Sequence, residues 1–189
     1  GTNPEDYGDY YAWGEIDPYY SSQDPLTWKD GKRGYNWDSY KWSNGSSSTL
    51  TKYITSSSYG TVDNKKVLEP EDDVAHVKLG GKWRMPTYAE WSELKAKCTW
   101  TWTTNYNGTG VKGRIVTATN GNSIFLPAAG YWSDADLINA GSYGDYRSSS
   151  VYTDEGIPSY AWSVVFNYTY LLRNYCYRCN GHSVRPVSE

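Results

Sequence analysis

The sequence predicts an α+β domain with two short helices, a set of short strands and long ordered loops. The chain of 189 residues contains 20 Tyr and 10 Trp but only 2 Phe and 1 Met. Together with its 18 Gly and many Ser, Thr and Asn, this composition favours strands and loops over helix bundles. Two segments carry helix-start signals, and several others have the alternation or β-branched content of strands. Nothing repeats at a fixed period, which excludes a solenoid or a propeller.

The first third of the chain is predicted to be mostly loop. One short strand fits residues 10–13, where Tyr and Trp cluster. Residues 16–66 show no sustained helical or strand period, and we interpret them as a long ordered loop. A disordered linker is the alternative, but disordered segments usually contain few aromatics. The expected buried anchors of this loop are Trp28, Trp37, Tyr40 and Trp42.

The first predicted helix lies in the segment LEPEDDVAHVKLGG. Pro70 stands near its start, acidic residues follow where the positive end of the helix dipole favours them, and Gly80 suits the C-terminal end. We expect Val74, Val77 and Leu79 to form its apolar side.

The second predicted helix begins at a capping box. Thr87 stands at the N-cap and Glu90 three residues later, and Pro86 marks the boundary just before them. Trp91 and Leu94 follow one turn apart, so this helix should pack on the sheet through them. The framework positions predicted to be buried are Trp83, Trp91 and Phe166.

Strand patterns dominate after Cys98. One segment alternates Trp with Thr, a second is β-branched, and a third is a short apolar run after an Asn-Gly-Asn turn. Two more strands are predicted near the C-terminus, the last of them entered through an Asn-Gly turn. The five predicted strands cover residues 99–106, 113–119, 123–126, 161–166 and 183–187.

Length and charge exclude several classes of protein. A chain of this length suits one domain, predicted over residues 1–189. The net charge of -3 gives no electrostatic reason to expect a nucleic-acid partner. No apolar run approaches the roughly 20 residues needed to span a bilayer. The chain opens at GTNPEDYGDYYAWGE, which we interpret as the start of an N-terminally trimmed mature fragment.

The three cysteines do not predict a metal or redox site. Cys176 and Cys179 have the C-x-x-C spacing, but a zinc site needs four ligands and a second pair is absent. Nothing in the sequence places His76 near His182. No βαβ pattern surrounds the motif, which argues against a thioredoxin-like role. We therefore expect neither a metal nor another cofactor.

The C-terminal segment has a restricted composition. Residues 163–188 contain no Lys, Gln, Glu, Met or Trp, and every Lys of the chain lies at or before Lys112. The types that fill the segment are mainly those that an Asn codon reaches by changing only its adenines. They are also types typical of contact surfaces, because Tyr gives stiff amphipathic area and Ser and Asn give adaptable hydrogen bonds. The segment is therefore predicted to be a binding face.

Four phrases in order carry a resemblance to a known family: YGDYYAWGE, GGKWRMPTYAEWSEL, NGNSIFLPAAGY, and AWSVVF followed by RCNGHSVRPV. They resemble the FISUMP (Fibrobacter-type major paralogous) domain of bacterial surface proteins, which is similar to the formylglycine-generating-enzyme branch of the C-type lectin fold. The resemblance implies a C-type lectin-like fold with two helices, a small twisted antiparallel sheet and extensive loops. It also implies an extracellular, cell-surface or phage-particle location.

A subset of this fold serves as the variable protein of diversity-generating retroelements, in which adenine-directed mutagenesis rewrites surface codons. The restricted composition fits that subset, with residues 143–182 as the candidate variable region. Scaffold positions are expected at Ala161, Val164, Phe166, Leu171 and Arg173. Arg147 stands where the family usually has Trp, so it is either a contact residue or a framework change. The exposed, replaceable positions are expected to be Ser163, Val165, Asn167, Tyr168, Tyr170, Leu172, Asn174, Tyr175, Cys176 and Tyr177.

These observations predict a non-catalytic module that binds a protein or glycan ligand on a cell or particle surface. A structural or adhesin tip domain of a bacterial appendage is the alternative, as is an ordinary antiparallel sheet with one solvated face. An enzyme of the formylglycine-generating kind is disfavoured. The related enzymes that carry out this chemistry depend on a reactive cysteine pair. In this chain no Lys lies near Cys176 or Cys179 in the sequence to lower a thiol pKa.

Overall fold

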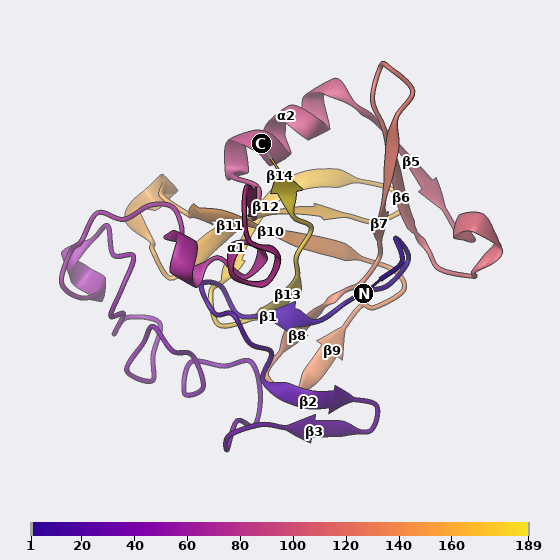
Figure 1. Ribbon diagram of the computed structural model, residues 1–189. Coiled ribbons are helices and arrows are strands. Elements are labelled where there is room, and N and C mark those ends of the chain that lie inside the picture. Colours follow the sequence, from indigo (N-terminus) through magenta and orange to yellow (C-terminus); the bar gives the residue numbers. More distant parts are fainter. Residues whose placement is uncertain (1, 189) are drawn as a thin grey trace.

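A seven-stranded mixed sheet forms the centre of the computed structural model, which describes residues 2–188 (Figure 1). Its strands follow the order β12-β11-β10-β13-β8-β9, and β1 pairs with β13 beside that path. The pairs are antiparallel except β10 with β13, which is parallel. The α+β class is therefore confirmed. The bounds are β1 (Tyr10–Tyr11), β8 (Tyr131–Ser133), β9 (Asp136–Ile138), β10 (Gly144–Val151), β11 (Tyr160–Phe166), β12 (Leu171–Tyr177) and β13 (Gly181–Ser183).

Three smaller sheets accompany the central one. The antiparallel sheet β5-β6-β7 stands at the right of Figure 1, and the hairpin β2-β3 lies at the bottom. The strands predicted at 10–13, 99–106, 113–119, 123–126 and 161–166 are confirmed with shifted ends, whereas β8, β9, β10 and β12 were not predicted. The remaining bounds are β2 (Tyr20–Gln23), β3 (Leu26–Trp28), β4 (Trp83–Arg84), β5 (Thr99–Thr103), β6 (Gly113–Thr117), β7 (Ser123–Pro127) and β14 (Val187–Ser188).

The prediction of one closing strand over residues 183–187 is wrong. The chain instead leaves the central sheet after β13 and pairs again as β14 with β4. Pro186 lies between the two strands, and a proline cannot donate a hydrogen bond to a ladder. Between β13 and β14, the side chain of Arg185 holds the chain in place by donating to the carbonyl oxygens of Pro4 and Phe125, each at 3.2 Å.

Residues 16–66 form the predicted ordered loop but contain more secondary structure than the sequence predicts. They contain the hairpin β2-β3, and an isolated bridge joins Tyr35 to Asp134. The expected anchor Tyr40 is buried. The three tryptophans are only half-buried, but they pack against the same core cluster as Tyr40: Trp28, Trp37 and Trp42.

The first helix is shorter than predicted. Pro70–Asp72 forms a 3-10 turn, and α1 (Val74–Leu79) begins only after Asp73. The Asp73 carboxylate caps α1 by accepting from the backbone N–H groups of residues 75 and 76, and it also accepts from residue 85. The predicted apolar side is wrong at Val77 and Leu79, which are exposed, because the short helix buries only its first turn.

The second helix, α2 (Tyr88–Lys97), confirms the predicted capping box. The Thr87 hydroxyl accepts from the backbone N–H of Glu90 at 3.3 Å, and the Glu90 carboxylate accepts from the backbone N–H of Thr87 at 2.7 Å. Trp91 is buried against the central sheet and Leu94 is half-buried beside it. The capping geometry therefore fixes where α2 begins and which side chains it turns inward.

Removing the cap should have a modest effect. We expect Thr87→Ala to lower the free energy of unfolding by about 1 kcal/mol, because the backbone N–H of Glu90 loses its partner. Urea denaturation of the two proteins measures the difference. An unchanged midpoint would show that water or a neighbour satisfies that N–H equally well.

Acid should weaken the start of α2 through Glu90. Arg84 donates two hydrogen bonds to its carboxylate, at 2.7 and 2.8 Å, and this charged partner lowers the pKa of Glu90 from 4.5 to about 2. A depressed folded-state pKa gives stability that is complete above pH 4.5 and is lost as the pH falls toward 2. In Glu90→Gln this part of the acid loss should be absent. Urea denaturation midpoints of the wild type and Glu90→Gln, measured between pH 4.5 and pH 2, test this prediction. A difference between the two midpoints that does not change with pH would contradict it.

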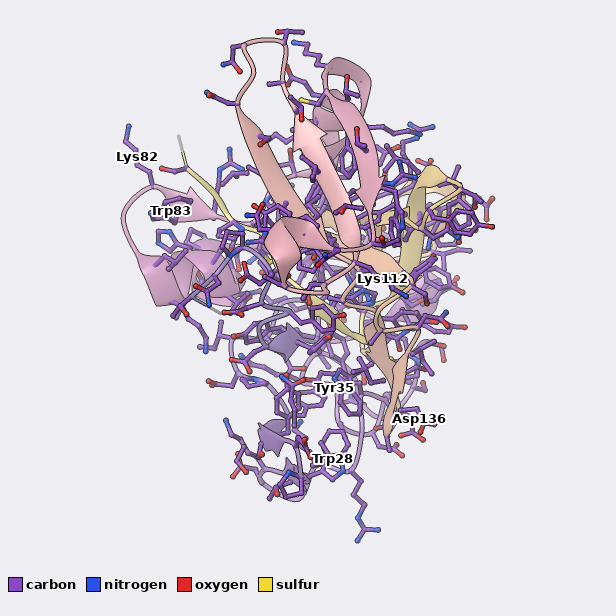
Figure 2. All side chains as sticks on the ribbon, turned by 90° about the vertical axis from the view of Figure 1, so that its right-hand side faces the viewer. Trp28, Tyr35, Lys82, Trp83, Lys112 and Asp136 are labelled. Carbon is purple, nitrogen blue, oxygen red and sulfur yellow. The ribbon has the colours of Figure 1, made fainter. Side chains whose placement is uncertain are left out.

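One framework prediction is wrong. Trp83 lies in β4 at the edge of the two-stranded sheet and is 41% exposed, beside Lys82 at the periphery (Figure 2). Its strand pairs with β14 at the edge of a two-stranded sheet, which leaves much of the indole in solvent. The other two predictions are confirmed, because Trp91 and Phe166 are both buried.

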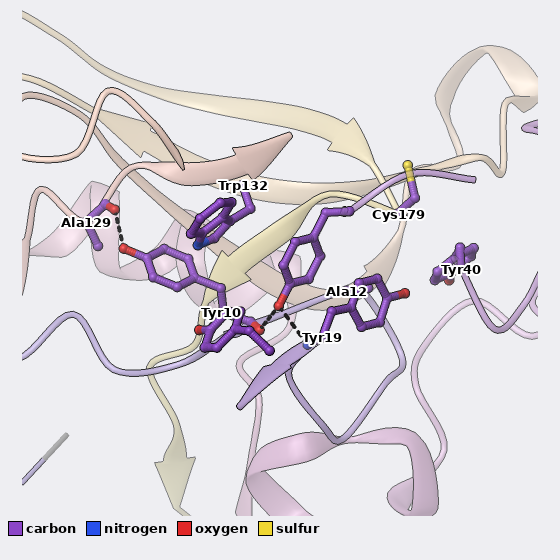
Figure 3. Packing of buried hydrophobic residues seen from close by; sticks show 9 residues of the cluster. Tyr10, Ala12, Tyr19, Tyr40, Ala129, Trp132 and Cys179 are labelled. Carbon is purple, nitrogen blue, oxygen red and sulfur yellow. Dashed lines mark hydrogen bonds between the residues drawn. The ribbon is translucent and has the colours of Figure 1, made fainter. Parts of the chain in front are cut away.

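The core uses tyrosines whose hydroxyl groups have hydrogen-bond partners, as the composition predicts. In the cluster drawn in Figure 3, the Tyr10 hydroxyl donates to the carbonyl of Ala129 and the Tyr35 hydroxyl donates to the carbonyl of Tyr10, each at 2.5 Å. Tyr40 likewise donates to the carbonyl of Trp13 at 2.7 Å. These bonds let the three tyrosine rings fill the interior with their hydroxyl donors satisfied.

Across residues 2–188, none of the helices has the length and apolar character that crossing a membrane requires.

Candidate functional site

The candidate site centres on β12, which lies at the edge of the central sheet, and on the turn that precedes it. Asn167 shapes this turn. Its side-chain oxygen accepts from the backbone N–H groups of Thr169 and Tyr170, at 2.8 and 3.0 Å. Arg114 on β6 holds the turn from below by donating to the carbonyl oxygen of Asn167 at 2.7 and 3.1 Å. Tyr168, at the tip, is 71% exposed. The turn therefore has a fixed backbone and an exposed side chain.

The register between β11 and β12 divides the predicted contact residues between two faces. Leu172, Asn174 and Cys176 lie opposite Val165, Ser163 and Ala161. Tyr175 and Tyr177 alternate with them and therefore point to the other side of the sheet. The predicted single patch of Tyr168, Tyr170, Leu172, Asn174, Cys176 and Tyr177 is wrong in this respect, because Tyr177 faces away from the residues at 172, 174 and 176. Asn174 and Cys176 are also only half-buried rather than fully exposed.

A row of aromatic rings covers the side of the sheet that carries Tyr175 and Tyr177. We call it the aromatic face. Tyr152 contacts the ring of Tyr175 at 4.2 Å, Tyr160 stacks on Tyr177 at 4.7 Å, and Tyr177 meets Trp37 edge-on at 5.6 Å. Tyr175 and Tyr177 are its most exposed members. The full set is Trp37, Tyr88, Tyr152, Tyr160, Trp162, Tyr175 and Tyr177.

Sequence reasoning missed the members of this face that precede β12. A signal existed, because Tyr160 and Trp162 repeat with period 2, as do Tyr175 and Tyr177. Tyr88 could not be found in that way. It comes from α2 and reaches Trp162 only through the fold, with 4.2 Å between the stacked rings.

The opposite side of β12 carries Leu172 and Asn174, with Tyr170 at the start of the strand. We call these three residues and Tyr143 the polar face. Tyr143 contacts the ring of Tyr170 edge-on at 6.3 Å. Leu172 and Tyr170 are exposed. Because β12 is an edge strand, both the aromatic face and the polar face are accessible along it.

Three predicted contact residues are buried instead. Ser163 and Val165 lie on β11, which has β12 on one side and β10 on the other, and both are 2% exposed. The prediction that they are exposed is wrong, because the second face of this inner strand is covered as well. Arg147 on β10 is 1% exposed. Its guanidinium donates to the carbonyl oxygens of residues 161, 176 and 177, so it is a framework residue that ties β12 to the sheet.

The two C-terminal thiols, Cys176 and Cys179, lie in an environment that disfavours the thiolate. Burial raises the pKa of Cys176 to about 12 and that of Cys179 to about 12. Cys179 belongs to the aromatic core cluster shown in Figure 3. All three cysteines are free. At neutral pH both C-terminal thiols therefore stay protonated and poorly nucleophilic.

A second candidate region lies away from β12. A pocket of about 460 Å³ opens between α2, β7 and the C-terminal segment, and Trp91, Leu94, Cys98 and Ile124 are among the residues that line it. None of the contact residues predicted from the sequence lies there.

Comparisons with known proteins gave no matching family model, no curated protein and no solved structure.

Proposed function

We propose that this chain is a non-catalytic binding module that contacts a macromolecular ligand through β12 and the turn before it. The proposal includes a FISUMP-type, C-type lectin-like fold and a place on a bacterial surface or a phage particle. One observation carries it. Thirteen large hydrophobic side chains are exposed within residues 2–188, and five of them fall in one ten-residue segment: Tyr168, Tyr170, Leu172, Tyr175 and Tyr177.

Such a concentration is typical of contact surfaces. Exposed apolar side chains are ordinary when they are scattered, but these five lie on one turn and on the two sides of one edge strand, and such a local concentration bordered by polar groups marks an interaction site. Tyrosine dominates the cluster, and its ring buries a large area for the loss of few rotatable bonds. Asn174 and Arg173 add hydrogen-bonding capacity beside it. These properties support ligand binding more directly than they support packing within the chain.

The framework beneath the segment supports the variable-protein hypothesis. Arg147 binds backbone carbonyls at the end of β12, and Arg114 binds the carbonyl of Asn167 before its start. Backbone contacts do not depend on which side chains β12 carries. The strand could therefore keep its course while its outward residues change. The buried positions Ser163 and Val165 could not vary as freely, which confines the proposed contact residues to the turn and β12.

Two alternatives make different use of the same surface. A structural tip domain would pack β12 on a sister subunit, and it should not tolerate replacement of the exposed tyrosines. An enzyme of the formylglycine-generating kind would need a reactive thiol. Burial raises the pKa of both C-terminal thiols, which argues against that chemistry.

The exposed tyrosines should contribute little to stability. We expect the combined change of Tyr168, Tyr170 and Tyr177 to Ser to leave the thermal midpoint nearly unchanged, because exposed substitutions usually stay within about 0.5 kcal/mol each. Calorimetry of the two proteins measures it. A large loss of stability would show that these rings belong to the core and would remove the binding-surface proposal.

Binding itself can be tested with two probes, a glycan array and intact bacterial cells. Wild-type protein is compared with the triple tyrosine variant and with a matched control that replaces Val77, Leu79 and Trp83, three exposed apolar residues elsewhere. We expect the tyrosine variant to bind about tenfold more weakly or worse, as for the loss of interface hot spots, and the control to bind like wild type. Equal signals from all three proteins, or none from wild type, would contradict the proposal.

The retroelement part has its own test in the gene. Codons for the exposed positions of β12 should differ from an Asn codon only where that codon has adenine, and a near-copy of this stretch should lie close by. Codons that break the rule at several of these positions would remove the retroelement hypothesis and leave the binding proposal standing.

A further inference from the structure

We propose that Asp145, Cys176 and His182 form a binding site for a zinc-like divalent cation on the inner side of the polar face. The three residues come from β10, β12 and β13. One donor atom from each lies within 4.8 Å of the other two. This site is independent of the proposed binding function, because none of its three residues is among the five exposed side chains that carry that proposal.

The distances suit a tetrahedral site. Cys176 Sγ lies 3.7 Å from one carboxylate oxygen of Asp145, and His182 Nδ1 lies 3.4 Å from the other. Zinc bonds of about 2.0–2.3 Å place neighbouring donor atoms roughly 3.5 Å apart. These two distances end on different oxygens of the Asp145 carboxylate, so a single oxygen, the thiol and the imidazole nitrogen, which lie within 4.8 Å of one another, would have to draw closer around a bound cation.

Unsatisfied polar atoms point to a missing partner at this place. Within residues 2–188, eight buried side-chain nitrogen or oxygen atoms lack a hydrogen bond, and five of them belong to Asp145, Arg147, Ser163 and His182, although Asp145 Oδ1 and His182 Nδ1 face each other as an ion pair. His182 is fully buried; its Nδ1 faces Asp145 Oδ1 at 3.4 Å without hydrogen-bond geometry, and its Nε2 has no hydrogen-bond partner. Buried polar groups without a partner are rare in folded proteins, so a group of them needs a physical cause. The five atoms are Asp145 Oδ1, Arg147 Nε, Ser163 Oγ, His182 Nδ1 and His182 Nε2.

The donor set selects the kind of cation. A thiolate and an imidazole are soft to borderline ligands and favour Zn²⁺ over Mg²⁺ or Ca²⁺, which prefer all-oxygen sites. Binding would release the thiol proton of Cys176 to solvent and leave His182 neutral, so that the sulfur and one ring nitrogen each donate a lone pair. Three protein ligands leave a fourth position for water, as in open zinc sites.

Arg147 limits the affinity. Its guanidinium lies within this cluster and holds three backbone carbonyl oxygens, so it cannot move away when a cation binds. The carboxylate and the thiolate together balance the two charges of the metal, and the guanidinium then leaves one positive charge in a buried site. We therefore expect weaker binding than in a structural zinc finger.

Two side chains beside the buried Asp145 and His182 reach partly to the surface. Cys176 is only half-buried, and Tyr131, which stacks on the His182 ring at 5.4 Å, is half-buried as well. A cation could enter past these two side chains without unfolding the sheet. Cys176 lies on the same side of β12 as Leu172 and Asn174 of the polar face, so a bound metal would lie on that side of the sheet.

Cobalt provides a direct readout, because a thiolate bound to Co²⁺ gives a charge-transfer absorption in the near ultraviolet. The reduced protein is titrated with Co²⁺ and then with Zn²⁺. We expect one Co²⁺ per chain, a thiolate band, loss of that band on adding Zn²⁺, and a higher thermal midpoint with Zn²⁺. Cys176→Ser should remove the band. The matched controls Cys98→Ser and Cys179→Ser should keep it.

The histidine gives a second comparison. His182→Asn should weaken Co²⁺ binding about tenfold or more, whereas His76→Asn should not change it. If His182→Asn fails to fold, Cys176→Ser decides alone, because its half-buried side chain tolerates the exchange of sulfur for oxygen. The absence of a thiolate band in the wild type, or a band that survives in Cys176→Ser, would overturn the proposal.

Discussion

Replacing Arg178 with Met is expected to lower the free energy of unfolding by about 3–5 kcal/mol, because several buried acceptors, each worth about 1–3 kcal/mol when left unsatisfied, lose their donor together. Arg178 is fully buried. Its guanidinium donates to the Tyr40 hydroxyl and to the carbonyl oxygens of Tyr53, Pro158 and Lys52, at 2.9–3.2 Å. Methionine fills a similar volume but donates nothing, so three carbonyls and one hydroxyl would lose their partner.

The effect should be large because Arg178 joins distant parts of the chain. Two of the carbonyls it binds, at residues 52 and 53, belong to the long loop of residues 16–66, and a third lies just before β11. Its guanidinium also packs 4.8 Å from the Trp13 ring and 5.8 Å from the Tyr53 ring. Without it, the loop would lose an attachment to the central sheet that no neighbouring side chain can replace.

The matched control is Arg33→Met, which makes the same chemical change at an exposed position and should stay within about 0.5 kcal/mol. Arg178→Lys keeps the charge but loses the fork of donors, and we expect it to fall between the other two. Urea denaturation at neutral pH separates the three variants. Equal stability of Arg178→Met and Arg33→Met would show that the loop is held mainly by its aromatic packing.

Arg178 also shows what sequence reasoning could not reach. Local signals correctly predicted the capping box at Thr87, the strand that contains Phe166 and the aromatic core, because each depends on residues that are near neighbours in the chain. Arg178 satisfies groups more than a hundred residues away, and no local pattern encodes that. The hairpin β2-β3 was missed for a related reason, since its strands are too short to show a period.

The candidate site was predictable only in part. Alternation gave the correct pairing of faces along β11, with Ser163 and Val165 on one side and Val164 and Phe166 on the other. The alternation of residue types does not show whether other parts of the chain cover a face of a strand. In the structure β11 is an inner strand, and its residues 163–166 are buried on both faces. The exposure of Tyr168 was predicted from the resemblance to variable proteins, and the structure confirms it. Asp145 and His182 come together because β10 pairs in parallel with β13, and no pattern in the sequence predicts that pairing.

The second large effect is expected at Trp91. We expect Trp91→Ala to cost about 3–5 kcal/mol, the usual range for truncating a buried tryptophan. The indole is 4% exposed and packs in a cluster with Tyr146 and Phe166. Its N–H donates to the carbonyl oxygen of Arg147 at 3.2 Å. Truncation would therefore leave both a cavity and an unsatisfied carbonyl beneath α2.

Trp83→Ala is the matched control, because it removes the same side chain from an exposed position. It should cost well under a third of the Trp91 effect, since solvent already covers much of the Trp83 indole and β4 keeps its backbone pairing with β14. Equal losses would show that burial of the indole against the sheet is not what makes the Trp91 substitution costly. A loss confined to Trp91 would establish that α2 is attached to the central sheet through this indole. The Trp91 indole N–H donates to the backbone carbonyl of Arg147, and the guanidinium of Arg147 binds the backbone at the end of β12. We therefore expect Trp91→Ala to destabilise β12 locally as well. Faster hydrogen exchange of the β12 amides in the variant would detect this.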